Sequence, residues 1–196
     1  MMGDCTITLV HGAGGTADKL ISLFEQIAEE EGWSPDGQLR AHVGRSVYFA
    51  VSVGGELAGG IQMELPDSSG TWSFETVWPE VRPEIDERAV YLSMFAFARK
   101  FRGDRTLFWL PCVEVWKYCK ERGIADMWLA ATPTTLAAYR RMGWPLEVRS
   151  EVRRHWGEDC FLTSMSLDAL EASVVARSAK ADTYKAVVRQ GRAAAG

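Results

Sequence analysis

Residues 137–145 read Ala-Ala-Tyr-Arg-Arg-Met-Gly-Trp-Pro, and this stretch decides the fold of the chain. Its first six residues favour a helix, and Gly143 suits the left-handed conformation that commonly closes one. The proline two residues later cannot continue the helix, so a strand is expected to begin beside it. Upstream, Thr132-Pro133 supplies an N-cap and a first helical residue. The pattern predicts a short helix that carries Tyr139 one turn before its end and leads directly into a strand.

Two apolar runs upstream of residue 137 predict the centre of a sheet. Residues 89–98 and 125–131 are mostly apolar and of strand length, as strands covered on both faces are. Residues 105–122 lie between them and have the apolar spacing of a helix. Pro111 falls inside that helix and is expected to kink it or delay its start.

The remaining elements follow from the same kinds of pattern. Gly54-Gly55 separates two runs rich in β-branched and aromatic residues and predicts a tight hairpin, and Thr16 is a plausible cap for the first helix. Further strands are expected at residues 6–10, 46–53, 56–65, 71–77, 146–153 and 160–166, and helices at residues 17–30 and from residue 168 onward. The sequence predicts one α/β (α+β) domain over residues 1–167, with a mixed, mostly antiparallel central sheet flanked by helices, and a helical tail over residues 168–196.

Composition and charge narrow the class of protein. The chain has 196 residues, of which 47% are hydrophobic, as in an ordinary globular domain. A net charge of −4 gives no global reason to expect nucleic-acid binding, and no apolar run approaches the ~20 residues that span a bilayer. Cys5, Cys112, Cys119 and Cys160 match no zinc spacing and are expected to be free thiols. We therefore expect a cytoplasmic protein without a metal site.

Four short motifs follow one another along the chain. They are Gly32-Trp33, Gly54-Gly55-Glu56-Leu57-Ala58-Gly59-Gly60-Ile61, Glu75-Thr76-Val77-Trp78-Pro79-Glu80-Val81 and Met142-Gly143-Trp144-Pro145. Together with the order of the expected elements, they resemble the GNAT acyltransferase superfamily. Within it, the resemblance is to the branch of acyl-homoserine-lactone (autoinducer) synthases and long-chain N-acyl amino acid synthases. The resemblance implies a GNAT-like fold and acyl transfer to an amine.

The chain departs from that branch at charged positions. An arginine of the branch's second hairpin strand is matched by Gln62, and its Glu-x-Ser-Arg on the central strand is matched by Tyr91-Leu92-Ser93-Met94. Asp36 matches one of two acidic residues that follow the Gly-Trp pair, and the other is absent near residues 38–40. These departures argue against homoserine-lactone synthesis itself.

The resemblance also implies where an acyl donor binds. In the superfamily, the pantetheine arm enters a gap between two central strands, here residues 89–98 and 125–131. Its phosphate end lies at the start of the following helix, where amide groups and cations form an anion site. The residues at this place are Arg99, Arg102, Gly103, Asp104, Arg105 and Thr106, with Lys100 nearby. They are expected to hold the diphosphate of acyl-CoA or the phosphopantetheine of an acyl-carrier protein; the alternative is a solvated basic loop.

Three residues are candidates for the chemistry. Tyr139 matches the tyrosine that protonates the departing thiolate in GNAT enzymes, although it also shares an apolar helix face and suits a core position. Glu75, or else Glu64, is the candidate base, and both are also plausible structural residues. Ser93 is placed to bind the acyl carbonyl or a bridging water, or simply to hydrogen-bond within the sheet.

Other aromatic and imidazole side chains are open to two interpretations. Trp109, Trp116, Trp128 and Trp144 suit either the wall of a long acyl pocket or plain core packing. His42 and His155 have polar neighbours in sequence and are expected at the surface.

Two hypotheses follow for function. The first is an N-acyltransferase that moves an acyl group from acyl-carrier protein or acyl-CoA to the amine of a small molecule or amino acid. The second is a catalytically degenerate GNAT-fold protein that binds an acyl thioester or a protein partner without turnover.

Overall fold

The computed structural model describes residues 4–66, 71–81 and 88–178, with side chains described as far as residue 174. The helical tail predicted from residue 168 begins as α5 (Leu167–Ser178), and its continuation lies outside the described residues. No helix in these ranges is long and apolar enough to cross a membrane.

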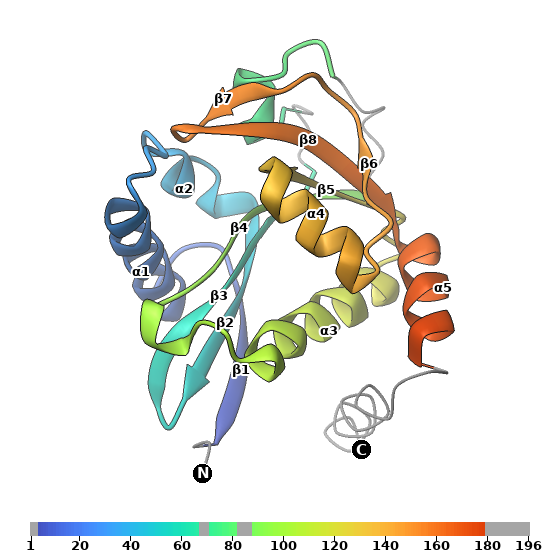
Figure 1. Cartoon of the computed structure of the whole chain (residues 1–196). Helices are drawn as coiled ribbons and strands as arrows, with labels where there is room; N and C mark the ends of the chain where they lie inside the picture. The colour runs from blue at the N-terminus through green and yellow to red at the C-terminus, as the bar shows by residue number, and fades with distance from the viewer. Residues whose placement is uncertain (1–3, 67–70, 82–87, 179–196) are drawn as a thin grey trace.

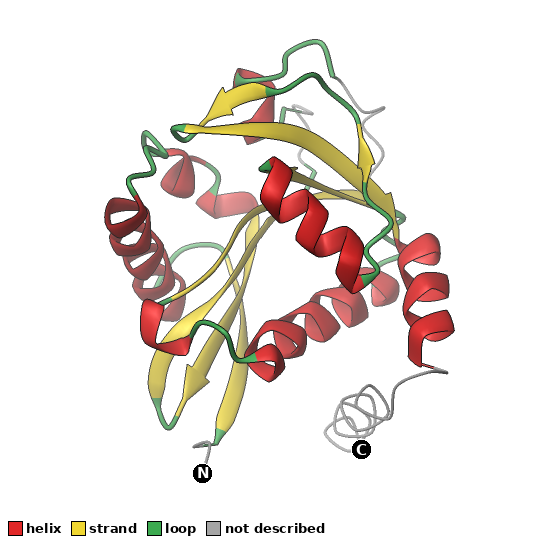
Figure 2. Ribbon diagram, in the orientation of Figure 1, coloured by secondary structure: helices red, strands yellow, loops and turns green. Residues whose placement is uncertain are grey.

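One mixed sheet of eight strands forms the centre of the molecule (Figures 1 and 2). Its order is β1-β2-β3-β4-β5-β8-β6, and β7 pairs with β8 off this path. Among the described strands, only the pairing of β4 with β5 is parallel, so the prediction of a mixed, mostly antiparallel sheet is confirmed. The strands are β1 (Cys5–His11), β2 (Ser46–Val53), β3 (Glu56–Glu64), β4 (Ala89–Phe97), β5 (Asp126–Ala131), β6 (Glu147–Val148), β7 (Arg153–His155) and β8 (Glu158–Ser166).

Helices cover both faces of the sheet. On one face, α1 (Thr16–Glu31) and α2 (Gln38–Ala41) pack over side chains such as Tyr48 and Met94. On the other face, α3 (Arg105–Glu121), α4 (Pro133–Met142) and α5 pack over a second set that alternates with the first along β2 and β4. This alternation is the period of two that a strand imposes on its side chains.

The hairpin and the short helix expected from the sequence are both present. Gly54 and Gly55 join β2 to β3 with φ values of 58° and 83°, the positive pair that a type I′ turn requires. Helix α4 has Thr132 as its N-cap, whose hydroxyl accepts from the Thr135 amide at 3.1 Å. Gly143 closes this helix at φ 100°.

The structure corrects the N-cap expected for the first helix, whereas α3 starts at Arg105 as predicted. Thr16 is the first residue of α1, and Gly15 is the N-cap, without a side-chain hydrogen bond. Helix α3 begins at Arg105 and continues through Pro111, so the proline does not delay its start. Asp104 explains this, because its carboxylate accepts from the amides of Thr106 and Leu107 and fixes the beginning of the helix.

Two strand predictions are wrong. Residues 71–77 contain a 3₁₀ turn, η2 (Ser73–Thr76), instead of a strand, because the Glu75 carboxylate accepts from the Trp72 amide at 3.2 Å and folds the segment back. Residues 146–153 do not form one strand but contain β6 and the start of β7. Between them the Ser150 hydroxyl, rather than a backbone carbonyl, accepts from the Leu162 amide at 2.9 Å, which interrupts the ladder.

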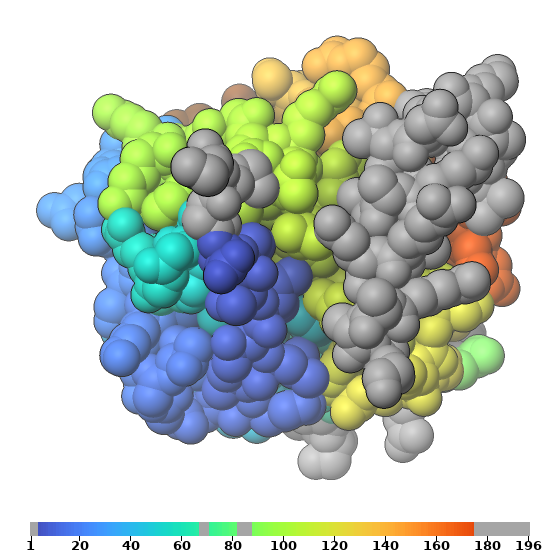
Figure 3. Space-filling model, turned by 90° about the horizontal axis from the view of Figure 1, so that it is seen from below, coloured from blue at the N-terminus to red at the C-terminus, as the bar shows by residue number. Residues whose placement is uncertain are grey.

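The end of the sheet near the β2–β3 hairpin lies beside the approach to α3. Figure 3 shows this end, with the hairpin in teal next to the yellow-green segment that leads into α3. Lys100, in the 3₁₀ turn η3 (Arg99–Phe101), is ion-paired with Glu56 at the start of β3. The hairpin therefore helps to fix the segment in which the sequence predicts an anion site.

Candidate active site

The two parallel strands separate in the middle of the sheet. Pairing of β4 with β5 ends at Leu92–Leu129, whereas β4 continues to Phe97. On its other edge, β4 pairs Leu92 with Met63 and Met94 with Gln62, so Ser93 is an extra, bulged residue. A bulge bends its strand and leaves the extra residue out of the ladder. The strands thus part beside Ser93.

A pocket of about 150 Å³ occupies this separation, and we call it the sheet pocket. It is lined from both faces of the sheet, since Tyr139 and Trp144 belong to the α3–α4 side and Trp33 and Trp156 to the α1 side. A second hollow of about 270 Å³, the edge pocket, shares Trp33, Phe95 and Tyr139 with it. It extends along β4 to Arg102, Gly103 and Asp104. The two pockets form a route from the start of α3 to the interior of the sheet.

Tyr139 stands where the two pockets meet. Its ring stacks on Trp144, with 4.5 Å between ring centroids, and lies 6.1 Å from Phe108. Burial raises the pKa of the Tyr139 phenol well above its usual value, so the hydroxyl keeps its proton at neutral pH. The side chain therefore both packs in the core and presents a proton donor to the pockets.

Acidic side chains occupy the predicted anion site. The Asp104 carboxylate accepts hydrogen bonds from two backbone amides at the start of α3. Glu31 of α1 accepts from the guanidinium of Arg102 at 2.7 Å and lies 3.6 Å from that of Arg99, and these arginines lower its pKa. Arg105 is exposed and has no ion pair among the described residues. The expected cations are present, but Arg99, Lys100 and Arg102 already have carboxylate partners.

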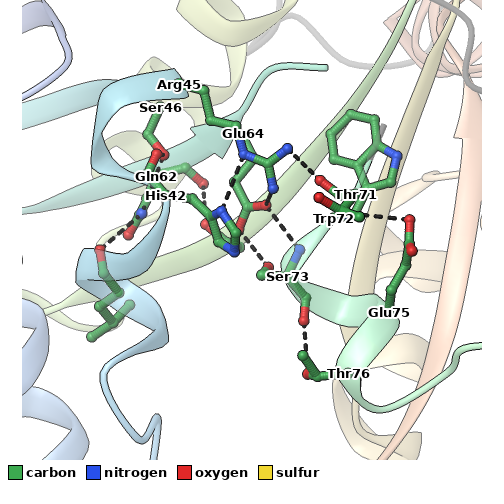
Figure 4. A network of polar contacts seen from close by, with 12 residues as sticks. His42, Arg45, Ser46, Gln62, Glu64, Thr71, Trp72, Ser73, Glu75 and Thr76 are labelled. Atoms are coloured by element: carbon green, nitrogen blue, oxygen red, sulfur yellow. Dashed lines mark hydrogen bonds and ion pairs between the residues drawn. The ribbon is translucent and has the colours of Figure 1, made fainter. Parts of the chain in front are cut away.

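Glu75 and Glu64 lie apart from Tyr139, and neither lines the two pockets. Glu75 caps its own turn, as described above. Glu64 is fully buried and accepts from the Ser73 amide at 3.2 Å and from the Ser73 hydroxyl. Oε2, the oxygen that accepts from the Ser73 amide, also lies 3.4 Å from the Arg45 guanidinium (Figure 4). These contacts anchor η2 to the sheet, so the structure does not bring either carboxylate to the pockets. Ser93, by contrast, lines the sheet pocket.

His155 is a pocket residue that the sequence did not reveal. The expectation of a surface position is wrong, since the side chain is 7% exposed and lines the sheet pocket. Its ring stacks on Trp156 at 4.9 Å and tilts against Trp78 at 5.5 Å. Nδ1 is buried without a hydrogen-bond partner. Burial lowers the pKa of His155 to about 4, so the imidazole is uncharged at neutral pH.

Two loops from distant parts of the sheet meet over the sheet pocket. Trp156 has φ 51° in the turn between β7 and β8, and its carbonyl accepts from the Ser34 amide at 3.1 Å. Its indole N–H donates to Gln38 at 2.9 Å. The unusual Trp156-Gly157 pair at a hairpin turn, together with Gly32-Trp33, is the sequence signal that points to these loops.

The tryptophans and cysteines singled out in the sequence lie partly in the core and partly in the sheet pocket. Of the four tryptophans considered for an acyl wall, Trp144 lines the sheet pocket, while Trp109, Trp116 and Trp128 pack against core clusters. The cysteines are free, and Cys160 lines the pocket. No cluster of His, Cys, Asp or Glu within the described ranges is arranged to hold a metal ion.

The fold is that of the GNAT acyltransferases. An acyl-homoserine-lactone synthase described as CoA-dependent, BjaI, is similar with a TM-score of 0.69 over 86% of this chain and 87% of its own, at 16% identity. FeeM, an N-acyl amino acid synthase from uncultured soil microbes, gives 0.66 over 87% and 94%, at 11% identity. The acyl-homoserine-lactone synthase LasI gives 0.67 over 87% and 96%, at 15% identity.

Neither protein-family models nor curated protein sequences match the chain. The likeness is therefore one of fold, and it agrees with the resemblance seen in the four sequence motifs.

Proposed function

We propose that this chain is an N-acyltransferase that moves an acyl group from a thioester to the amine of a small molecule or amino acid. The observation that carries the proposal is the position of Tyr139, a protonated phenol at the junction of two pockets beside the separated strands. A thioester that enters along the edge pocket would bring its sulfur past this hydroxyl. The same fold in BjaI and FeeM, whose names describe acyl transfer, supports the proposal.

The chemistry needs two proton transfers. The amine nitrogen attacks the thioester carbonyl carbon, a tetrahedral intermediate forms, and the carbon–sulfur bond breaks to give an amide and a thiolate. Tyr139 is the proposed donor of a proton to that thiolate, because a neutral phenol can serve as a general acid. His155 is the proposed acceptor of the proton that the amine loses, in place of Glu75 or Glu64. The bulged Ser93 is the proposed position of the acyl carbonyl.

Acyl-CoA is the donor that the comparisons support best. A structure of BjaI contains isopentyl-CoA and has a TM-score of 0.62 to this chain, at 16% identity. In this proposal Arg99, Arg102 and Arg105 meet the diphosphate, with Gly103, Asp104 and Thr106 at the helix start. An acyl-carrier protein would offer the same phosphopantetheine to the same residues, so it remains the alternative donor.

The second candidate function is binding of an acyl thioester without turnover. Asp104 and Glu31 favour it, because each places a carboxylate where the diphosphate is expected. In this alternative the chain has the fold and pocket of an acyltransferase, but it binds the phosphate groups of the donor more weakly than an active enzyme does.

Mass spectrometry of the purified chain with a panel of acyl-CoA and acyl-carrier-protein donors and pooled amines separates the two. An N-acyltransferase yields an amide product, and Tyr139→Phe lowers its rate by about 10²-fold or more through loss of the general acid. Tyr118→Phe is the matched control, because Tyr118 is a buried tyrosine of α3 outside both pockets. Binding of acyl-CoA with no product from any donor supports the second function, and absence of both contradicts both.

A further inference from the structure

The part of the sheet pocket opposite Tyr139 has a chemical character of its own. We call it the acceptor half and define it by Trp33, Tyr91, His155, Trp156, Glu158 and Cys160. Trp33 and Trp156 pack with the α1 cluster and Tyr91 and Cys160 with the cluster under η2, whereas Tyr139 and Trp144 pack with the α3–α4 cluster. His155 contacts the rings of Trp78 and Trp156, and Glu158 is its partner across the β7–β8 hairpin. An amine in this half would approach a thioester from the other face of the sheet.

Among the residues that the structure describes, the sheet pocket is lined by no cation with which to bind a carboxylate. None of these lining residues is lysine or arginine, and His155 is uncharged at neutral pH. The neighbouring arginines are engaged elsewhere: Arg153 with Glu80 at 2.7 Å and Arg154 with Asp159 at 3.3 Å. A buried carboxylate without a cation or several N–H donors is strongly unfavourable.

The same half suits an ammonium group attached to a flat ring. Glu158 is the one acidic side chain among the described residues that line the sheet pocket; it is exposed, and a carboxylate attracts a cation and repels an anion. Trp33 and Trp156 present aromatic surface, which favours both cations and planar rings. The unpartnered nitrogen of His155 adds a polar group in a site that is otherwise largely apolar.

We propose that the acceptor is an arylalkyl amine without a carboxylate, held in the acceptor half with its amine between Glu158 and His155. This inference rests on the proposed function and narrows its acceptor from any amine or amino acid to a carboxylate-free amine. The ring lies against Trp33 and Trp156, and the amine faces the bulge at Ser93.

Three probes of one series test the charge requirement. Phenethylamine lacks the carboxylate of phenylalanine, and phenylalaninamide replaces it with an uncharged group of nearly the same size. Calorimetry with the purified chain is expected to show phenethylamine and phenylalaninamide bound at least about tenfold more tightly than phenylalanine, since only the last must bury an unpaired anion. Phenylalanine binding as tightly as its amide, or no binding of any of the three, overturns the proposal.

A variant locates the effect at Glu158. Glu158→Gln is expected to reduce the preference for phenylalaninamide over phenylalanine several-fold, because the repulsion of the carboxylate is removed. Glu121→Gln, an exposed carboxylate at the end of α3, is the matched control and is expected to leave the preference unchanged. An unchanged preference in Glu158→Gln overturns the role of this residue.

Acyl-transfer rates with the same probes separate this inference from the proposed function. Product formed fastest from phenylalanine supports an N-acyltransferase and overturns the carboxylate-free acceptor. The expected binding order without any product overturns turnover and leaves the acceptor half as a binding site for carboxylate-free amines.

Discussion

The indole nitrogen of Trp156, which lines the sheet pocket, donates a hydrogen bond to the side-chain oxygen of Gln38 at 2.9 Å. Trp156 belongs to the turn between β7 and β8, and Gln38 begins α2. The bond therefore connects the β8 half of the sheet with the helices that cover the β1–β4 half. It also holds the Trp156 ring against His155.

Removal of this link is expected to loosen the pocket. Gln38→Ala leaves the indole N–H without its partner and should cost about 1 kcal/mol in the free energy of unfolding. Under the proposed function, the KM for the amine should rise several-fold while the effect on kcat stays smaller. Denaturant unfolding and steady-state kinetics measure the two effects. Gln26→Ala, which removes an exposed bond to Glu30 on α1, is the control. An unchanged amine KM in Gln38→Ala would show that the link does not shape the acceptor half.

Burial of His155 predicts a loss of stability in acid. Its pKa falls from 6.5 to about 4 on folding, so between these values the unfolded chain binds a proton that the folded chain does not. The contribution of His155 to the free energy of unfolding is fully present above pH 6.5 and is lost as the pH falls toward 4. The loss should reach about 2 kcal/mol near pH 4.5.

His155→Phe keeps an aromatic ring in the stack and removes the titration. The difference in unfolding free energy between the wild type and this variant should therefore change with pH across that window. Carboxylates that titrate there are common to both proteins and cancel in the difference. Parallel curves for the two proteins would contradict a lowered His155 pKa.

Gly60 is expected to be one of the least replaceable residues in the sheet. A Cβ atom at this position would lie 2.2 Å from the Phe49 carbonyl oxygen and 3.2 Å from Leu20 of α1. Because the first contact is with backbone, it cannot be relieved by a side-chain rotation. Gly60→Ala should cost about 3 kcal/mol or more. Gly44→Ala, which would meet open space, is the control and should change thermal stability little. A Gly60→Ala protein as stable as the Gly44→Ala protein would contradict this packing.

Local signals explain which parts of the fold the sequence predicts. The α4 helix and the β2–β3 hairpin were predictable because Thr132, Gly143 and Gly54-Gly55 each fix a backbone conformation without help from distant residues. The strand expected at residues 71–77 was wrong for the opposite reason. Trp72 and Phe74 alternate with more polar residues, as side chains of a strand do. Both are buried in the cluster with residues of β4 and β8, although the segment is a 3₁₀ turn.

The acceptor half was hidden by its polar neighbours in sequence. His155 lies among Arg153, Arg154 and Glu158, a composition that indicates a surface turn. Its burial comes from Trp78 and Trp156, whose positions depend on the η2 segment and on the contact with Gln38. Tyr139 was a candidate because a motif resembled a known superfamily. No motif pointed to His155, since its place in the pocket depends on segments that meet only in the folded chain.

Asp104 provides the sharpest test of how the chain binds an acyl donor. Its carboxylate caps α3 through the amides of Thr106 and Leu107, at the place proposed for the diphosphate of CoA. Asp104→Asn keeps an oxygen that can cap the helix and removes the negative charge that would repel a phosphate. We expect stability to fall by less than about 1 kcal/mol, and the affinity for acyl-CoA, measured by calorimetry, to rise several-fold at low salt. Asp126→Asn, at the start of β5, has the same change in charge away from both pockets and serves as the control. If Asp104→Asn leaves the affinity unchanged, the diphosphate lies elsewhere; if it weakens binding, the carboxylate orders the amides that hold the phosphate. Only a gain in affinity that fades as salt is raised fits a diphosphate held back by the charge of Asp104.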